Sequence, residues 1–328
     1  MRISVALTTF NGARFLLPQL QSILNQTIRP DQIVICDDCS SDSTVDIADS
    51  FAQKTDMRVD IHRNDFNLGV NKNFEKAVGL CDQNADLILF CDQDDIWDPR
   101  KVEVTVKAFK ISSSPRLMLA IHDCTLCDAE MTIILDSLIE NIQGDKGSNK
   151  DFVHGCCTTI GCDLRDLLFP IPAEVEPIGY DEWMHVAAEM LGVRLMQADK
   201  LLNYRRHENN VSSSTSYSVN AKIFSKIKKY FYLLIRRSNK KPGLDWLRKR
   251  LAMVVILKSR LKLLAGINQL HNSSYARLLD VENSIQKRML IRNSFFPVGV
   301  IRAAFLYVSG GYVFYSGYKS MMADILRR

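Results

Sequence analysis

Several common signatures are missing from this chain of 328 residues. It contains no Gly-x-Gly-x-x-Gly fingerprint and no Gly-x-x-x-x-Gly-Lys-Ser/Thr loop, which disfavours ordinary dinucleotide-binding and ATP-binding folds. A secretory leader pattern is also missing at the N-terminus, so we expect a cytoplasmic protein. Cysteine is absent after Cys162, and the nine cysteines fit reduced, mostly structural thiols. The spacings Cys36/Cys39 and Cys124/Cys127 leave zinc as an alternative.

Acidic residues are scarce in the last third of the chain. From Ala221 onward, 22 Lys and Arg accompany four Asp and Glu, a net charge of +18. The preceding residues carry 20 basic and 33 acidic side chains, a net charge of −13. This asymmetry implies two different partners. The last third interleaves Lys and Arg with large apolar residues, as basic helices on anionic membrane surfaces do. A solvated helical subdomain is the alternative, and no recognised nucleic-acid motif accompanies these helices.

One apolar segment in this region has nearly the length of a membrane span. Phe295–Tyr315 contains one charge, Arg302, together with Pro297 and three glycines. About 20 apolar residues suffice to cross a bilayer. The arginine and the glycines favour instead a helix pair that lies in the membrane interface.

Short apolar runs alternate with helical patterns through the first two-thirds. Strands are predicted at Ile3–Thr9, Gln32–Cys36, Arg58–His62 and Leu87–Cys91, with helical patterns between them. Further strands are predicted at Leu117–His122, Phe152–Ile160 and Val193–Ala198, and a helix that opens within Gly179–Trp183 and reaches about Leu191. We therefore expect an α/β fold with a mostly parallel, right-handed doubly wound sheet.

The segment Asp86–Pro99 contains the closest grouping of candidate functional residues. Asp92, Asp94 and Asp95 follow directly after a buried strand, and Asp98-Pro99 is typical of the start of a helix. Ligands bind at the carboxyl ends of strands in open α/β sheets. Three crowded carboxylates repel one another, and a hard divalent cation between them removes this repulsion. An acidic turn that only caps a helix is the alternative.

Two other acidic pairs accompany this segment: Asp37/Asp38 at a strand end and Asp181/Glu182 at a helix start. With them, residues 1–215 resemble the GT-A-fold glycosyltransferases of family 2, especially the rhamnosyltransferase-like branch that makes bacterial surface polysaccharides. The resemblance rests on six motifs in order: Thr8-Thr9-Phe10-Asn11-Gly12, Asp37 to Thr44, Asn67-Leu68-Gly69, Asp92 to Pro99, Tyr180-Asp181-Glu182-Trp183 and Tyr204-Arg205-Arg206-His207.

The resemblance implies a GT-A (Rossmann-like) sheet, a nucleotide-sugar donor and a Mg²⁺ or Mn²⁺ cofactor. The residues that it implies for the donor are Thr8, Asn11, Asp38, Lys72, Asp92 and Arg205. The metal ligands that it implies are Asp94, Asp92 and His207, although His207 can also contact the diphosphate or simply lie on the surface. The cation would neutralise charge on the leaving phosphates.

The resemblance also implies a general base. A sugar hydroxyl needs its proton removed in the transition state, and Asp181 occupies the position of the family's base, with Glu182 as a fallback. Attack opposite the leaving group inverts the anomeric carbon. Trp183 and His154 are weak candidates for the acceptor side, with core packing as the alternative. Tyr180 departs from the branch, which usually has histidine before this aspartate.

We therefore expect an inverting, metal-dependent glycosyltransferase. Its GT-A domain is predicted at 1–215, with a donor half at 1–115 and an acceptor half at 116–215, followed by a basic helical membrane-associating region at 216–328. The acceptor is expected to be a lipid-linked saccharide of O-antigen or capsule type, the donor a UDP- or dTDP-sugar such as dTDP-rhamnose, and the location peripheral on the inner face of the cell membrane. Alternatives are a sugar-1-phosphate nucleotidyltransferase and a catalytically silent membrane-bound module.

Overall fold

The computed structural model describes residues 1–144, 154–175, 178–208, 210, 242–264, 269–294, 296–315 and 317–326. In these ranges one mixed sheet has the strand order β3-β2-β1-β4-β8-β6-β9-β5, with β7 paired to β6 at its side. The sequence also predicts a helix at Ile223–Ile235 and a serine-rich domain boundary at Val211–Ser218; both segments lie outside the described residues.

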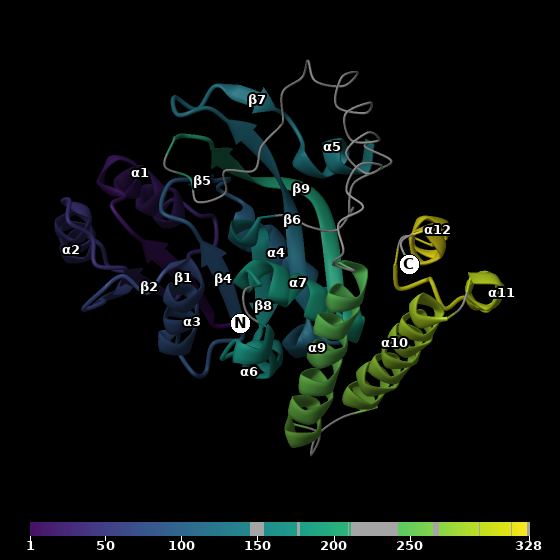
Figure 1. Ribbon diagram of the computed structural model, residues 1–328. Coiled ribbons are helices and arrows are strands. Elements are labelled where there is room, and N and C mark those ends of the chain that lie inside the picture. Colours follow the sequence, from purple (N-terminus) through teal and green to yellow (C-terminus); the bar gives the residue numbers. More distant parts are fainter. Residues whose placement is uncertain are drawn as a thin grey trace.

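Four parallel strands form the first half of the sheet, as the sequence predicts (Figure 1). They are β1 (Ile3–Thr9), β2 (Gln32–Asp37), β3 (Arg58–Arg63) and β4 (Leu87–Cys91). Every residue of β2 and β4 is buried, which explains their continuous apolar runs. The connecting helices are α1 (Ala13–Leu24), α2 (Thr44–Lys54) and α3 (Val70–Leu80).

The second half of the sheet mixes directions. β8 (Thr158–Gly161) is antiparallel to β4 and to β6 (Leu119–Cys127), whereas β9 (Arg194–Arg205) is parallel to β6. The strand expected at Phe152–Ile160 is therefore shorter, because residues Gly155–Cys157 form a 3-10 turn. The other two predicted strands extend well beyond their expected ends. The remaining short strands are β5 (Ile96–Trp97) and β7 (Ile133–Leu135).

The helix expected after the acidic segment, from about Arg100 to Lys110, is confirmed as α4 (Lys101–Ile111). The Asp98 carboxylate accepts a hydrogen bond of 2.9 Å from the backbone N–H of Arg100, in the turn that precedes this helix. The short strand β5, between the acids and α4, was not expected. Its pairing with β9 depends on residues about 100 positions away, so no local pattern indicates it.

Three further helices complete the part of the chain that carries the sheet: α5 (Leu138–Gly144), α6 (Cys162–Leu168) and α7 (Tyr180–Leu191). The bounds of α7 confirm the predicted helix. It ends at Gly192, whose φ of 75° is in the left-handed region that a glycine cap adopts.

Two long helices, α9 (Pro242–Leu264) and α10 (Gln269–Asn293), follow the sheet domain and pack against it (Figure 1). Leu247, Leu257 and Leu278 belong to the same hydrophobic core as the central strands. The Arg260 guanidinium also donates hydrogen bonds to the carbonyls of Leu167 and Pro170, at 2.9 and 2.7 Å. The sheet domain and these helices therefore share one core, and the predicted domain boundary at 215/216 stays a prediction.

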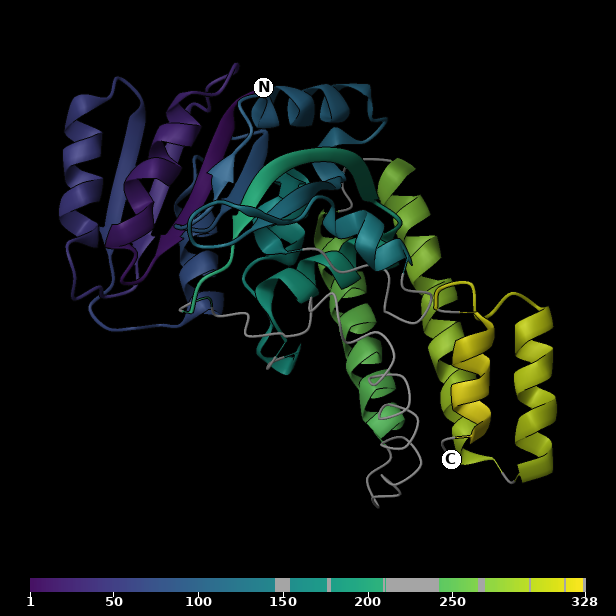
Figure 2. The same cartoon turned by 90° about the horizontal axis from the view of Figure 1, so that it is seen from above.

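The last two helices are α11 (Phe296–Val308) and α12 (Tyr318–Leu326), and Figure 2 shows them at the end of the molecule opposite α2. They form a second, small core with the end of α10, built from Ile291, Ala303, Leu306 and Tyr312. Among the described residues no helix is both long and apolar enough to cross a bilayer. The apolar segment Phe295–Tyr315 is not one continuous helix, because α11 ends at Val308.

Candidate functional site

The three acids after β4 lie within one small region and have different partners. Asp94 Oδ2 lies 2.8 Å from His207 Nε2 and accepts a hydrogen bond of 3.3 Å from the Asn210 amide. Asp95 Oδ1 accepts the backbone N–H of Arg205 at 3.0 Å, while its Oδ2 is buried without a hydrogen-bond partner. The sequence-predicted pair Asp94 and His207 is thus brought together across 113 residues.

The electrostatics of these acids are unfavourable. Burial, and next the charge of Asp94, raise the pKa of Asp92 to about 7; the charge of Asp181 also raises it. Burial raises the pKa of Asp95 well above its ordinary value, with further contributions from Asp94 and Asp92. Two neighbouring carboxylates are therefore held where ionisation is costly, an arrangement typical of functional sites.

A divalent cation fits this arrangement. Ligand atoms of Asp92, Asp95 and Cys156 all lie within 4.8 Å of one another. The orphaned Asp95 Oδ2 offers a buried oxygen that a cation would satisfy, and hard cations prefer such oxygens. The Cys156 thiol fits a hard cation less well, and burial holds its pKa well above the ordinary value. The donor set thus consists of carboxylates, with a neutral thiol beside them.

Lys101 is a buried residue of this region that sequence reasoning missed. Its side chain is fully buried; the ammonium donates a 2.8 Å hydrogen bond to the Cys156 carbonyl and lies 4.0 Å from the centre of the Trp97 ring. Burial lowers its pKa, while the charge of Asp95 opposes that shift. The signal was available, because Lys101 shares the helical spacing of the buried residues Thr105 and Phe109.

Gln93, between the acids, was also missed. Its amide accepts from the Phe10 N–H at 2.8 Å and donates to the Phe10 carbonyl at 3.1 Å, in the manner of a strand neighbour. Gly12 makes room for it, since a Cβ on Gly12 would lie 2.0 Å from Gln93 Oε1. Gln93 therefore fastens the acidic turn to the loop after β1.

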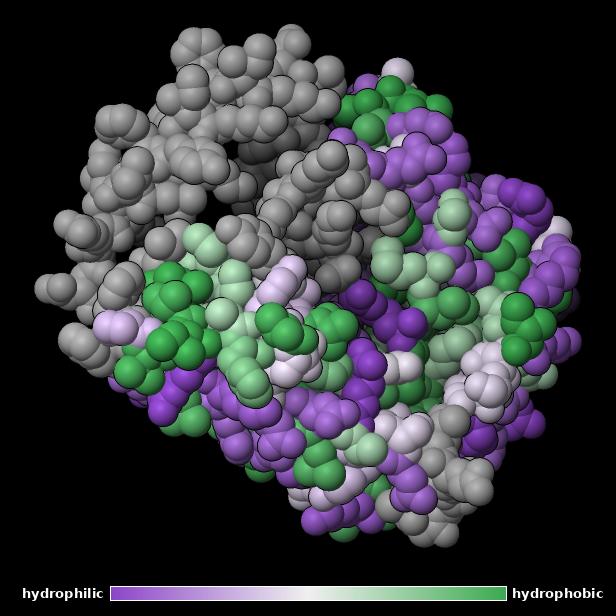
Figure 3. Space-filling model, turned by 90° about the vertical axis from the view of Figure 1, so that its right-hand side faces the viewer, coloured by the Kyte–Doolittle hydropathy of each residue, from purple (hydrophilic) through white to green (hydrophobic). Residues whose placement is uncertain are grey.

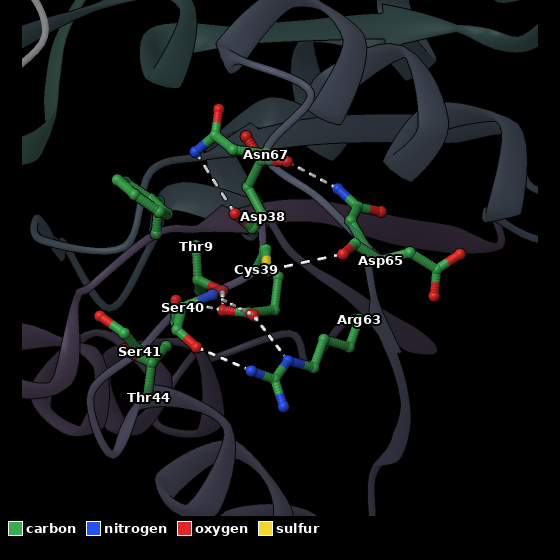
Figure 4. Close-up of polar contacts among 12 residues, drawn as sticks. Thr9, Asp38, Cys39, Ser40, Ser41, Thr44, Arg63, Asp65 and Asn67 are labelled. Carbon is green, nitrogen blue, oxygen red and sulfur yellow. Dashed lines mark hydrogen bonds and ion pairs between the residues drawn. The ribbon is translucent and has the colours of Figure 1, made fainter.

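The loops after β1, β2 and β3 are joined by a polar network (Figure 4). Asp38 accepts hydrogen bonds from the Asn64 amide and from the backbone N–H groups of Leu68 and Gly69, at 2.7 to 2.8 Å. Asn11, in the left-handed region with a φ of 48°, accepts the Ser41 N–H at 2.8 Å. Both residues predicted for the donor pocket thus shape its loops.

The other predicted donor residues have different surroundings. Arg205 is buried; its guanidinium donates to the carbonyls of Asp94 (2.8 Å) and Ala129 (2.5 Å) and lies 4.7 Å from the Phe15 ring centre. These contacts hold the acidic turn in place. Lys72, in the first turn of α3, forms an ion pair of 3.2 Å with Glu75. Thr8 lies at the carboxyl end of β1 and is half-buried.

Asp181 lies in the first turn of α7. Burial raises its pKa from the ordinary value, while a hydrogen bond from the Glu182 N–H opposes that shift. Asn71 of α3 anchors this helix start by accepting the Tyr180 N–H at 2.9 Å and donating to the Ile178 carbonyl at 3.1 Å. A half-buried carboxylate with a raised pKa, whose charge acts on Asp92, is suited to accept a proton.

Two weak acceptor-side candidates lie in the interior. Trp183 is fully buried and donates from its indole N–H to the Leu168 carbonyl at 2.9 Å, which fits the alternative that it is a core-packing residue. His154 stacks on Tyr204 at 4.2 Å, and burial lowers its pKa to about 4, which keeps the ring neutral at pH 7. Glu182 is exposed, in contrast to Asp181.

Comparisons with known proteins match the first third of the chain to glycosyltransferases. Residues 4–114 match the family model described as Glycosyl transferase family 2. The chain is 36% identical over 100 residues to the dTDP-rhamnosyl transferase RfbG of Shigella flexneri. This match covers 30% of this chain and 34% of that protein. It is 33% identical over 96 residues to the O-antigen chain rhamnosyltransferase RfbN of Salmonella typhimurium, covering 29% of each. These matches thus span about a third of each curated relative.

A solved structure resembles nearly the whole chain. The crystal structure of TarS residues 1–349 from S. aureus, in complex with UDP-GlcNAc, superposes with a TM-score of 0.52 at 14% identity, covering 99% of this chain and 89% of that one. At this identity the likeness shows the fold. It extends the agreement beyond the residues that the family model matches.

Proposed function

Because residues 4–114 match the family model of glycosyl transferase family 2, we propose that this protein transfers one sugar from a nucleotide-sugar donor to a hydroxyl of a lipid-linked saccharide, with inversion at the anomeric carbon. The observation that carries the proposal is that an acidic cluster and a separate aspartate from another element lie near each other. The cluster Asp92, Asp94 and Asp95 follows β4, and Asp181 at the start of α7 is close enough for its charge to raise the pKa of Asp92.

The donor half would hold the nucleotide. The loops that contain Asn11 and Asp38 lie at the carboxyl ends of β1 and β2, and their conformation depends on the hydrogen bonds described above. A Mg²⁺ or Mn²⁺ ion would be held by Asp92 and Asp95, whose ligand atoms lie within 4.8 Å of each other, with Asp94 and His207, which contact one another, as the further expected ligands. Such an ion supplies neutralisation of the charge that develops on the leaving diphosphate. Arg205 positions the acids by donating to the Asp94 carbonyl, and Lys101 positions Cys156 beside them by donating to its carbonyl.

Asp181 would remove the proton from the attacking hydroxyl. Its burial favours the neutral acid after transfer, because desolvation disfavours the carboxylate. A base on the face opposite the leaving nucleotide gives a single displacement. The names of the relatives, both rhamnosyltransferases, support dTDP-rhamnose as the first donor to test. The basic last third supports a peripheral site on the inner face of the membrane, where a lipid-linked acceptor is held.

The decisive experiment replaces Asp181 by Asn. Transfer from the donor to a lipid-linked saccharide extract should fall at least about 100-fold, since a general base contributes that much, while donor affinity stays unchanged. Glu182→Gln is the matched control, one position along the helix and exposed, and should retain transfer. The donor is chosen by screening UDP-, dTDP- and GDP-sugars for Mn²⁺-dependent thermal stabilisation.

Other outcomes would replace the proposal. Undiminished transfer by Asp181→Asn would remove Asp181 from the mechanism. Release of pyrophosphate from a nucleoside triphosphate and a sugar 1-phosphate would identify a nucleotidyltransferase. Donor binding without transfer by the wild type, with every donor, would indicate a silent binding module.

A further inference from the structure

Helix α11 has two apolar faces, and only one of them is used inside the molecule. Ala303 and Leu306 are buried in the small C-terminal core. On the other side, four apolar residues at spacings of three, four and three form one stripe. Their exposed fractions are 44% for Val298, 70% for Ile301, 75% for Phe305 and 85% for Val308. Figure 3 views the molecule from the side on which α11 lies, and hydrophobic residues gather in patches on that surface. We refer to these four residues as the outer stripe.

The small core that buries the inner face of α11 lies beside a buried polar network of α10, α12 and the turn after α11. Asp324 of α12 accepts hydrogen bonds from the Arg288 and Arg292 guanidinium groups of α10 and from the Tyr312 hydroxyl, at 2.6 to 3.1 Å. These contacts join α10, the turn after α11 and α12 into one unit. Because Ala303 and Leu306 on the opposite face are packed in the core, the outer stripe faces away from the rest of the unit.

The charges around the outer stripe are of one sign. Between residues 286 and 326 the sequence has five basic residues and one acid, Asp324, which is fully buried. Arg302 adjoins the stripe and is exposed, as is Lys287 on α10. Between residues 286 and 326 the described charged side chains that are exposed, Lys287 and Arg302, are therefore cations, whereas the exposed acid Asp280 lies earlier on α10. The surface around the outer stripe thus complements an anionic one.

We propose that α11 is an interfacial docking helix that inserts its outer stripe into the headgroup and acyl boundary of an anionic bilayer. This inference rests on the proposed function, which places the acceptor on a lipid. With 13 residues α11 is about 20 Å long, too short to cross a hydrocarbon core of about 30 Å but suited to lie within its surface. A second copy of the chain would bring like charges together, which disfavours self-association through this face.

The test uses the full-length protein and two double variants. Ile301→Glu with Phe305→Glu adds two charges to the outer stripe at positions too exposed to disturb folding. Ile111→Glu with Ile133→Glu is the matched control, because these two side chains are 86% and 63% exposed and lie outside α11. Co-sedimentation with vesicles of phosphatidylcholine containing about a third phosphatidylglycerol measures binding. We expect the first variant to bind at least about tenfold more weakly than the wild type, and the control to bind equally.

Each other outcome counts against the proposal. Equal vesicle binding by the stripe variant and the wild type would overturn it, as would no binding by the wild type. A wild-type dimer that becomes monomeric in the stripe variant, measured by sedimentation velocity without lipid, would assign the face to a second copy. Donor-induced thermal stabilisation, recorded on the same samples, reports separately on the proposed function, so the two can fail independently.

Discussion

Two regions of this molecule bury carboxylates, and they treat them in opposite ways. At the end of β4, Asp92 and Asp95 lie among like charges, and one oxygen of Asp95 has no partner. In the C-terminal unit Asp324 is fully buried but paired with Arg288, Arg292 and Tyr312. A buried carboxylate with its partners supplied holds helices together, whereas one left in need of a cation marks a site. Burial alone does not distinguish a structural carboxylate from a site carboxylate, but the presence or absence of hydrogen-bonding and cationic partners does.

The largest expected difference comes from removing one charge in each region. Asp324→Asn leaves two buried guanidinium groups without their anion and should lower the free energy of unfolding of the C-terminal unit by about 3–5 kcal/mol. Asp95→Asn removes a charge that its neighbours disfavour, and the amide oxygen can still accept the Arg205 N–H. Without a cation this variant should stay within about 1 kcal/mol of the wild type.

Urea unfolding measures both effects, and hydrogen exchange of α11 and α12 measures the effect of Asp324→Asn on the C-terminal unit. Asp245→Asn is the control for the first variant, since that carboxylate is exposed and pairs with Arg248 on the surface of α9. Equal losses for Asp324→Asn and Asp95→Asn would show that the two carboxylates are supported alike, and the comparison would fail.

The sequence predicted the donor half more fully than the C-terminal unit. Short buried strands such as β4 and the acids that end them are local patterns, and parallel pairing then brings their ends together. The contact of Asp94 with His207 was expected only through family resemblance, because β9 delivers His207 from over 100 residues away. The burial of Trp183 and the outward direction of Ile301 depend on which helix face meets a neighbour. Residues around both positions are apolar on more than one side of the helix, so the apolar periodicity did not indicate which side is buried.

Substitutions at Gly12 and Gln93, which position the acidic turn, should have a smaller effect, on donor binding. Gly12→Ala places a methyl group where the Gln93 amide lies and should weaken donor binding by about 1–3 kcal/mol. Gln93→Ala removes the hydrogen bonds to Phe10 and opens that space. The double variant should therefore lose less than the sum of the single losses, as isothermal titration with the donor can measure. Strict additivity would mean that the two side chains do not share this space.

The smallest expected effect concerns the acid limb of the pH profile. Asp181 must be ionised to accept a proton, and burial raises its pKa above the ordinary value of about 3.9. The rate at saturating donor and cation should therefore begin to fall at a higher pH than for an exposed aspartate base. Asp92, whose pKa is about 7 without a cation, influences donor and cation binding, so kcat and kcat/KM need to be recorded separately. A kcat that stays constant down to pH 4, with donor affinity intact, would mean that the proton is taken by a group less buried than Asp181, and the contrast between buried carboxylates with and without partners would then not extend to the base.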